Sequence, residues 1–548
     1  MTKMKRFSAE YRRHYLEEMS EKELDVLVIG GGITGAGIIL DASSRGLKTG
    51  LLEMQDFASG TSSRSTKLVH GGLRYLKQFD IKLVSEVAKE RKVVYENAPH
   101  VTTPVPMLLP IIKGGTFGKI STSIGLKVYD YLAKVKKKEK RIMLNRKETL
   151  RREPLLRKEG LKGCGAYVEY QTDDARLTIE VLKEAVKRDA IAVNYAKVVQ
   201  FIYKESQVTG VVVKDVIHNK EYNIKAKKII NATGPWVDTL REEDRSRDGK
   251  RLFLSKGVHI VVDKQRLPLK HAIYFDTEHD GRMLFAIPRD HKVYIGTTDT
   301  AFDGDIANPK MTEEDVNYLL NAANYIFPTA QLTKIDVESS WAGIRPLIHE
   351  EGKKASEISR KDEVFISPSG LISIAGGKLT GYRKMAEKIV NMICRDLELR
   401  SICITEKLPL SGGHIGGSNK LEKYIEEKVK VGVKYGLDET EALSLVRRYG
   451  ANVETIFKEM RGNNRISIRQ SAMPDSLFAS LKYGIEEEMV TSPIDFYNRR
   501  TGILLFNINE VNKYKDEVLD YLSYRLKWSA REKEKHRHSL EKEMNRTL

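Results

Sequence analysis

The feature that most constrains this 548-residue chain is a short aliphatic run followed at once by a glycine pattern. Leu24 to Ile29, LDVLVI, is nearly all aliphatic, as expected of a buried parallel strand. Gly30, Gly32 and Gly35 follow as GxGxxG, and the next residues, AGIILDASSRG, have helical spacing. A second strand-like run, KTGLLE, ends in Glu53. This order predicts a βαβ unit that binds a dinucleotide.

Each part of the predicted unit is expected to contact one part of the dinucleotide. The glycines permit a tight turn, and the pyrophosphate can then rest on amide groups at the N-terminus of the helix. Seventeen residues separate Gly35 from Glu53, whose carboxylate we expect to accept hydrogen bonds from the adenosine ribose. The alternative interpretation is a glycine-rich turn between strand and helix that holds no ligand.

Two later segments repeat the order of strand, then glycine. Residues 226–238, AKKIINATGPWVD, place a strand directly before the turn Ala232–Gly234. Residues 370–393, GLISIAGGKLTGYRKMAEKIVNMI, contain a strand, the pair Gly376 and Gly377, and then a helical pattern. Three separate glycine junctions that converge on one elongated cofactor favour FAD over NAD.

Composition limits the classes of partner. The chain carries 41% hydrophobic and 31% charged residues, which is typical of a globular protein, and its length suggests two or three domains. The net charge of +18 favours an anionic partner. A phosphorylated substrate, a nucleotide cofactor, an acidic membrane surface and nucleic acid all satisfy that condition.

The cysteines and the apolar segments indicate a compartment. Cys164, Cys394 and Cys403 form no CxxC pair, so we predict neither a metal site nor a redox dithiol. Few cysteines favour a reducing, intracellular location. The first residues lack the apolar core of a signal peptide, and no stretch approaches the ~20 apolar residues of a membrane-spanning helix. If the chain meets a membrane, we expect it to lie on the surface.

A basic loop follows the βαβ unit. Residues 62–76, SSRSTKLVHGGLRYL, gather four basic side chains around a glycine pair and contain almost no acid. The basic residues are Arg64, Lys67, His70 and Arg74. One interpretation is a solvated loop. The other is that the glycines let a flat or anionic ligand approach while the cations hold its charge.

The joint order of several segments resembles one flavoprotein family. The segments are GGGITGAGIILDASSRGLKTGLLEMQDFASGTSSRSTKLVHGGLRYL, YVEYQTDDARLTIEVLKEAV, NATGPWVD, GTTDT, WAGIRPL and GGKLTGYR. They resemble the FAD-dependent (aerobic, quinone-linked) glycerol-3-phosphate dehydrogenases from about residue 20 to 400, and SPIDFYNRRTGILLF extends the resemblance toward the C-terminus. Gly381 departs from the family's GKLTTYR, so a side-chain contact at that position is not carried over.

The glycine patterns and the resemblance together imply FAD, bound non-covalently. The expected cofactor contacts come from the three junctions, the basic loop and the strand after Asn194, and they are Gly30, Gly32, Gly35, Glu53, Thr61, Ser62, Ser63, Lys67, His70, Gly71, Gly72, Val198, Ala232, Thr233, Gly234, Gly376, Gly377, Leu379 and Thr380. For His70, a purely structural role is the alternative.

The reaction implied by the resemblance is oxidation of sn-glycerol 3-phosphate at C2 to dihydroxyacetone phosphate, with hydride transfer to N5 of FAD. For the base that takes the hydroxyl proton we favour His259, because an unperturbed imidazole titrates near neutrality. Arg345 stays protonated and is expected to hold the alkoxide-like oxygen. Asp280 is expected to orient His259 or to bind a substrate hydroxyl.

The resemblance also implies a phosphate clamp. Arg74 would bind the substrate phosphate with Tyr75 beside it, and Lys378 would support the phosphate or the flavin. Structural alternatives exist for the catalytic candidates as well. A histidine on a strand is more often structural than catalytic, and the Asp-Gly pair at Asp280 is often only a turn.

The expected architecture is α/β, or α+β overall. It comprises a discontinuous Rossmann-like FAD-binding domain, an antiparallel-sheet substrate domain and a helical C-terminal cap domain. The expected ranges are 20–75, 150–250 and 340–400 for the first, 76–149 and 251–339 for the second, and 410–548 for the third. The tail from about residue 529 is strongly charged, and we expect it to fray.

The expected partners follow from the family. Electrons would pass to membrane quinone, and the protein would be cytoplasmic and peripheral on the inner face of the cell membrane, either alone or as a homodimer. The basic runs 133–141 and 525–548 suit an anionic membrane surface or plain solvent. An oxidase that uses oxygen is the nearest alternative. A flavin-dependent RNA-modifying protein is disfavoured, because aromatic residues make up only 8% and do not interleave with the basic runs, so no nucleic acid partner is predicted.

Overall fold

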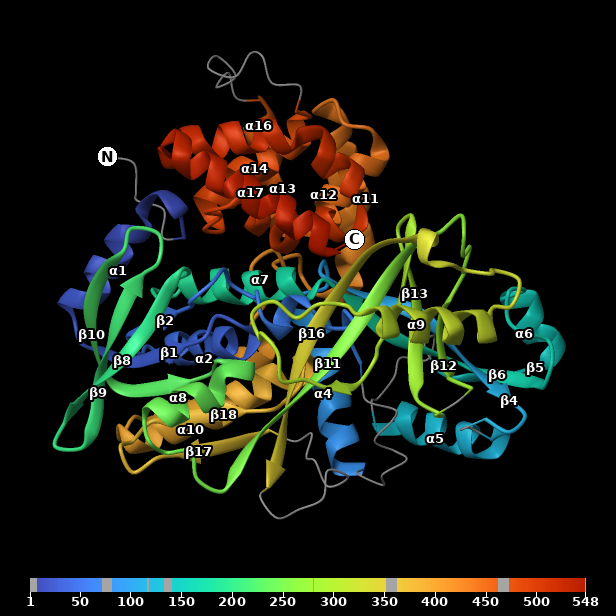
Figure 1. Ribbon diagram of the computed structural model, residues 1–548, viewed down its shortest axis with the longest axis horizontal. Helices are drawn as coiled ribbons and strands as arrows, with labels where there is room; N and C mark the ends of the chain where they lie inside the picture. The colour runs from blue at the N-terminus through green and yellow to red at the C-terminus, as the bar shows by residue number, and fades with distance from the viewer. Residues whose placement is uncertain are drawn as a thin grey trace.

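The computed structural model describes residues 7–70, 81–115, 118–132, 140–278, 280–350, 362–461 and 473–547. Figure 1 shows two sheets side by side, with a layer of C-terminal helices above them. The strands are β1 (Leu24–Ile29), β2 (Thr49–Leu52), β3 (Leu68–Val69), β4 (Thr102–Ile112), β5 (Ile142–Asn145), β6 (Leu161–Thr172), β7 (Ile191–Val193), β8 (Ala196–Lys204), β9 (Gln207–Asp215), β10 (Lys220–Asn231), β11 (Lys250–Asp263), β12 (Ala272–Asp276), β13 (Met283–Arg289), β14 (Lys292–Gly296), β15 (Thr300–Ala301), β16 (Val337–Glu350), β17 (Glu363–Ile366) and β18 (Ile372–Ala375). The α-helices are α1 (Arg12–Glu21), α2 (Ile33–Ser44), α4 (Ile81–Asn97), α5 (Lys119–Leu132), α6 (Arg146–Arg152), α7 (Asp174–Val186), α8 (Val237–Glu243), α9 (Glu313–Ile326), α10 (Tyr382–Asp396), α11 (Leu421–Lys434), α12 (Glu439–Tyr449), α13 (Val453–Arg461), α14 (Asp475–Glu487), α15 (Ile503–Phe506), α16 (Ile508–Leu526) and α17 (Ala530–Thr547).

The first sheet is built on parallel strands. Its order is β17-β18-β10-β1-β2-β7, and the pairs from β18 to β7 are all parallel. The antiparallel strands β8 and β9 lead into β10. The units β1, α2 and β2 confirm the predicted βαβ unit, and β1 is almost wholly buried, as an aliphatic central strand should be.

Helices from distant parts of the chain cover this sheet. Helix α2 packs against both α7 and α10. The N-cap of α7 is Asp173, whose side chain accepts a hydrogen bond from the Arg176 amide at 3.0 Å. Helix α10 begins at Tyr382, just after the glycine pair that ends β18. The glycine junctions therefore lie at the carboxyl ends of neighbouring parallel strands, where ligands bind in such sheets.

The second sheet is mostly antiparallel and has the order β15-β11-β14-β13-β12-β4-β6-β3, with β16 paired to β11 and β5 to β6. Helix α9 packs against β11 and β14. Three strands belong to this sheet although they fall wholly or mostly within the ranges expected for the FAD-binding domain: β3 in 20–75, β6 in 150–250 and most of β16 in 340–400. The reason is their pairing, because β6 forms a ladder with β4, and β16 forms a long one with β11.

The C-terminal part is helical, from α11 to α17, as expected. The expectation that the tail frays is wrong, because α17 is an ordered helix that packs on α16 and β16. Leu540 and Met544, one helical turn apart, are buried and anchor it. Among the described residues, no helix combines the length and the apolar character needed to cross a bilayer.

Candidate cofactor and active site

A cavity of about 520 Å³ opens beside the carboxyl ends of β1, β2 and β10. Thirteen of the residues predicted to bind cofactor or substrate line it: Gly30, Gly32, Glu53, Thr61, Ser62, Val198, Ala232, Thr233, Gly234, Gly376, Gly377, Lys378 and Leu379. All three glycine junctions therefore meet at one cavity, as the sequence predicted.

The turn after β1 tolerates only glycine at two positions. Gly30 has φ of +114°, and a Cβ added there would lie 2.5 Å from the carbonyl oxygen of Ala232. A Cβ on Gly35 would overlap the carbonyl oxygen of Gly30. The backbones of the turn after β1 and the turn after β10 are therefore in direct contact, with no side chain between them. The first turn of α2 then faces the cavity.

The first turn of α2 is partly capped from the basic loop. The amide of Ile33 donates to the Ser62 hydroxyl at 2.9 Å. The neighbouring Thr61 hydroxyl donates to the carbonyl oxygen of Ile344 at 2.6 Å, which ties the loop to β16. Gly32 and Thr34 line the cavity beside this cap, so the helix N-terminus presents a site for an anionic group.

Glu53 is fixed at the end of β2. Its two carboxylate oxygens accept hydrogen bonds from the amides of Gly31 at 2.7 Å and Gln55 at 2.8 Å. Burial raises the pKa of Glu53, and the two amide hydrogen bonds act in the opposite direction. The carboxylate is therefore held in one orientation at the cavity wall.

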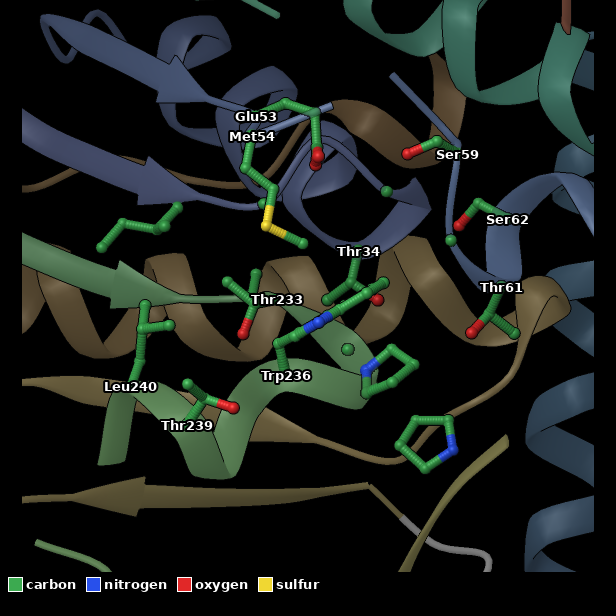
Figure 2. A pocket seen from close by; sticks show the side chains of 18 of the residues that line it. Thr34, Glu53, Met54, Ser59, Thr61, Ser62, Thr233, Trp236, Thr239 and Leu240 are labelled. Carbon is green, nitrogen blue, oxygen red and sulfur yellow. The ribbon is translucent and has the colours of Figure 1, made fainter. Parts of the chain in front are cut away.

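The cavity is elongated. Figure 2 shows Thr61 and Ser62 at one end and Leu240 at the other, with Thr34, Thr233 and Trp236 between them. The walls are mainly apolar, and a few hydroxyl and backbone groups converge on the space. This shape is typical of a dinucleotide site.

Five predicted cofactor residues lie outside the lining of this cavity: Gly35, Ser63, Lys67, His70 and Thr380. The Lys67 ammonium donates to Asp174 at 2.6 Å and to the carbonyl oxygen of Ser63 at 3.0 Å, so its charge ties the loop to α7. The Thr380 hydroxyl donates to the carbonyl oxygen of His70 at 3.2 Å, and burial lowers the pKa of His70.

Four further predictions, Gly71, Gly72, Arg74 and Tyr75, lie outside the described residues.

The two predicted catalytic residues are brought close together by the pairing of β11 with β16. His259 lies opposite Trp341 in the ladder, and its ring stacks on the indole at 4.7 Å between centroids. Arg345 lies four residues beyond Trp341 on β16, directly before Pro346, which lines the cavity.

His259 is only 2% exposed. Its Nε2 lies 3.0 Å from the Thr66 hydroxyl, and its buried Nδ1 has no hydrogen-bond partner among the described residues. Burial, followed by the charges of Arg345 and Lys67, holds the pKa of His259 well below its usual value. The imidazole is therefore neutral at pH 7 and able to accept a proton.

Arg345 is held by the loop after β14. Its guanidinium donates to the Thr297 hydroxyl at 2.9 Å and to the Asp299 carboxylate at 3.2 Å. Asp280 lies elsewhere, since its carboxylate accepts from the Thr277 hydroxyl at 2.5 Å and from the Tyr318 hydroxyl at 3.2 Å. The structure thus brings His259 and Arg345 close together, whereas Asp280 accepts hydrogen bonds from its own turn and from α9.

Comparisons with known proteins identify the family. Residues 25–383 match the family described as FAD dependent oxidoreductase, and residues 403–533 match the C-terminal domain of alpha-glycerophosphate oxidase. The chain is 56% identical over 541 residues to the aerobic glycerol-3-phosphate dehydrogenase of Bacillus subtilis, covering 98% of this chain and 97% of that protein. It is 55% identical over 524 residues to the Staphylococcus aureus enzyme of the same name, covering 94% of each.

The chain belongs to the aerobic glycerol-3-phosphate dehydrogenases, a group of FAD-dependent oxidoreductases.

Solved structures show the same fold. The glycerol-3-phosphate dehydrogenase of Bacillus halodurans complexed with FAD superposes with a TM-score of 0.86 at 52% identity, covering 99% of this chain and 98% of that one. The FAD-bound L-alpha-glycerophosphate oxidase of Mycoplasma pneumoniae has a TM-score of 0.56 at 18% identity, covering 68% and 95%. The second likeness shows the fold alone.

FAD fits the residues present in this family member. The bare backbone at Gly30 and Gly35, the start of α2 at the cavity wall and the fixed carboxylate of Glu53 match a pyrophosphate and a ribose. Sequence reasoning missed other lining residues, among them Met54, Trp236 and Pro346. Met54 and Pro346 directly follow the predicted residues Glu53 and Arg345, so adjacency was the available signal.

Proposed function

We propose that this protein oxidises sn-glycerol 3-phosphate at C2 to dihydroxyacetone phosphate and passes the electrons to membrane quinone, as a peripheral protein of the cytoplasmic membrane face. The observation that carries the substrate assignment is the 56% identity to an aerobic glycerol-3-phosphate dehydrogenase over nearly the whole chain. The net charge of +18 supports both a phosphorylated substrate and an anionic membrane surface.

Bound FAD supplies the acceptor for the hydride that leaves C2. The residues of this chain that would hold the cofactor are the three glycine junctions, Glu53 and the hydroxyl-bearing Thr61 and Ser62. Lys378, which also lines the cavity, is proposed to support the phosphate or the flavin. Arg74 and Tyr75 remain proposed phosphate ligands.

His259, which is buried against Trp341 and lies outside the cavity lining, is proposed as the base that takes the hydroxyl proton. The imidazole is already neutral, which a base requires, although its depressed pKa makes it a weak acceptor in the free protein. A doubly charged phosphate near Arg345 would offset the cations that depress this pKa. Substrate binding would then strengthen the base, while Arg345 stabilises negative charge that develops on the C2 oxygen.

The first test is anaerobic mixing of the oxidised holoenzyme with glycerol 3-phosphate or glycerol. Loss of the flavin absorbance with glycerol 3-phosphate, and much less with glycerol, is the expected result. His259→Asn should slow this step about 10²-fold or more, because a general base is lost. His291→Asn, an exposed histidine at the turn before β14, is the matched control and should react at the wild-type rate.

Reduction of the His259→Asn flavin at the wild-type rate with an unchanged pH profile would assign the base elsewhere. The acceptor is tested separately by mixing the reduced protein with a short-chain quinone or with oxygen. Faster reoxidation by quinone supports the proposal, whereas faster reoxidation by oxygen identifies an oxidase. Release of the protein from membranes by salt would support attachment through charge.

A further inference from the structure

The segment GTTDT, residues 296–300, spans the turn from β14 to β15 and contacts both predicted catalytic residues. Gly296 pairs with His259 in the ladder between β14 and β11, and a Cβ added to Gly296 would overlap the imidazole ring. The next three residues all accept hydrogen bonds from the Arg345 guanidinium. A single loop therefore touches both side chains.

Strands β11 and β16 place the two side chains on one face of their ladder. Arg345 and Trp341 lie four residues apart on β16, and His259 on β11 pairs with Trp341. Between these two rows, Gly257 lies opposite Gly343, so the middle row has no side chain. A Cβ on Gly257 would overlap Nη2 of Arg345. The guanidinium therefore lies over bare backbone and extends along the ladder toward His259.

The main chain of Arg345 is fixed at the cofactor site. The Thr61 hydroxyl donates to the carbonyl oxygen of Ile344 at 2.6 Å, and Pro346 lines the large cavity. The charge of the side chain is also constant, because a guanidinium stays protonated. What remains variable is the direction of the side chain, since a long side chain has many rotamers. The loop 297–299 supplies the contacts that limit this freedom.

Asp299 is the charged residue of this loop. Nη1 of Arg345 donates to its carboxylate at 3.2 Å, and Nη2 donates to the Thr297 hydroxyl at 2.9 Å. The carboxylate also accepts from the Ser255 hydroxyl, and Arg282 donates to the carbonyl oxygen of Asp299 at 2.9 Å. The exposed fraction is 32% for the Arg345 side chain and 29% for that of Asp299, and an ion pair that water reaches contributes little to folding stability. The pair is therefore better suited to orienting a side chain than to stabilising the fold.

We propose that Asp299 is a positioning residue that directs the guanidinium of Arg345 toward His259. This inference rests on the proposed function, in which His259 takes the hydroxyl proton and Arg345 stabilises charge on the same oxygen. Both groups have to meet one oxygen atom, so the direction of the guanidinium decides whether they act together. A displacement of about 1 Å can slow such a step about 10²-fold. Asp299 acts through Arg345 and not on the substrate.

The test measures anaerobic flavin reduction by glycerol 3-phosphate in the FAD-loaded protein. Asp299→Asn should lower the limiting rate at least about tenfold, because it releases the guanidinium. FAD content should be unchanged, and the melting temperature should stay within about 2 °C of the wild-type value. Asp303→Asn is the matched control, since it removes an exposed carboxylate four residues further along the chain, and it should react at the wild-type rate. Ser255→Ala leaves the charge of Asp299 but removes one of its donors, so reduction should slow about two- to fivefold.

A double-mutant cycle tests whether Asp299 acts through Arg345. In an Arg345→Gln background, Asp299→Asn should slow reduction by less than about twofold further, because the group that it positions is absent. Equal slowing in both backgrounds would overturn the inference, and so would a wild-type rate for Asp299→Asn beside a slow Arg345→Gln. A wild-type rate for Arg345→Gln would refute the proposed role of Arg345 as well, so the two failures are distinguishable. If Asp299→Asn does not fold, Ser255→Ala provides the same comparison in both backgrounds.

Discussion

A buried carboxylate connects the cofactor site to the C-terminal helices. Asp56 lies three residues beyond Glu53 and is almost fully buried. It accepts hydrogen bonds from Arg499 at 2.5 Å and from Arg500 at 2.8 Å, both on the π-helix Asp495–Arg500. Burial raises the pKa of Asp56, but Arg500 and Arg499 outweigh this effect and lower the pKa to about 2. The carboxylate is therefore charged at neutral pH.

The same carboxylate braces two segments that line the large cavity. Asp56 accepts from the Asn194 side chain at 2.9 Å. Nearby, the Glu53 amide donates to the carbonyl oxygen of Val193 at 3.0 Å, and the Ala196 amide donates to that of Glu53 at 2.8 Å. Glu53 and Ala196 both line the cavity. A disturbance at Asp56 would therefore reach the wall expected to meet the adenosine.

Asp56→Asn keeps the shape of the side chain and removes its charge. Breaking a buried ion pair by neutralising one partner costs about 3–5 kcal/mol. Most of this cost lowers the free energy of unfolding, with or without FAD. A part of about 1.4 kcal/mol that applies only to the FAD-bound form weakens FAD binding tenfold. We therefore expect at least a tenfold higher dissociation constant for FAD, together with a lower melting temperature.

The assay is titration of apoprotein with FAD, followed by the quenching of flavin fluorescence. Asp41→Asn is the matched control, because Asp41 is also buried and pairs with Arg45 at 2.5 Å, toward the far end of α2 and outside the cavity lining. It should lower the melting temperature without changing FAD affinity. Equal FAD dissociation constants for the two variants, at similar losses of stability, would refute the coupling.

Three further predictions follow from individual positions. Gly35→Ala should yield protein with little FAD, measured as the flavin-to-protein ratio, because the added methyl group overlaps the Gly30 carbonyl oxygen. Gly296→Ala should slow flavin reduction at normal FAD content, because the methyl group overlaps the His259 ring outside the cofactor cavity. Burial lowers the pKa of His100 to about 4, so its protonation favours the unfolded chain. Stability should fall as the pH drops below about 6.5, by about 2 kcal/mol at pH 5, and thermal unfolding of His100→Gln should lack this component.

The local parts of the fold could be predicted from sequence. The strand, the glycine turn and the helix of the βαβ unit are set by neighbouring residues, so β1, α2 and Glu53 were found from their order alone. The helical C-terminal part was equally visible from composition and spacing.

Long-range pairing could not be predicted in this way. Lys67 resembles a ligand of a bound anion, but its partner Asp174 lies 107 residues away and satisfies its charge inside the protein. No local sequence pattern assigns strand β16 to the second sheet, because the strand with which it pairs, β11, lies far upstream in the chain. Helix α17 looks solvated, since Leu540 and Met544 are its main buried apolar side chains among many charged ones.

The ion pairs of Asp56 also set an order of events during synthesis. Asp56 leaves the ribosome 443 residues before Arg499, the cation that its carboxylate contacts. A nascent chain can form the β1-α2-β2 unit early, but Asp56 then lacks the charges that hold it in place. The wall of the cofactor cavity is completed only after the π-helix has emerged. We therefore expect tight FAD binding only after the π-helix has been made and has docked against Asp56.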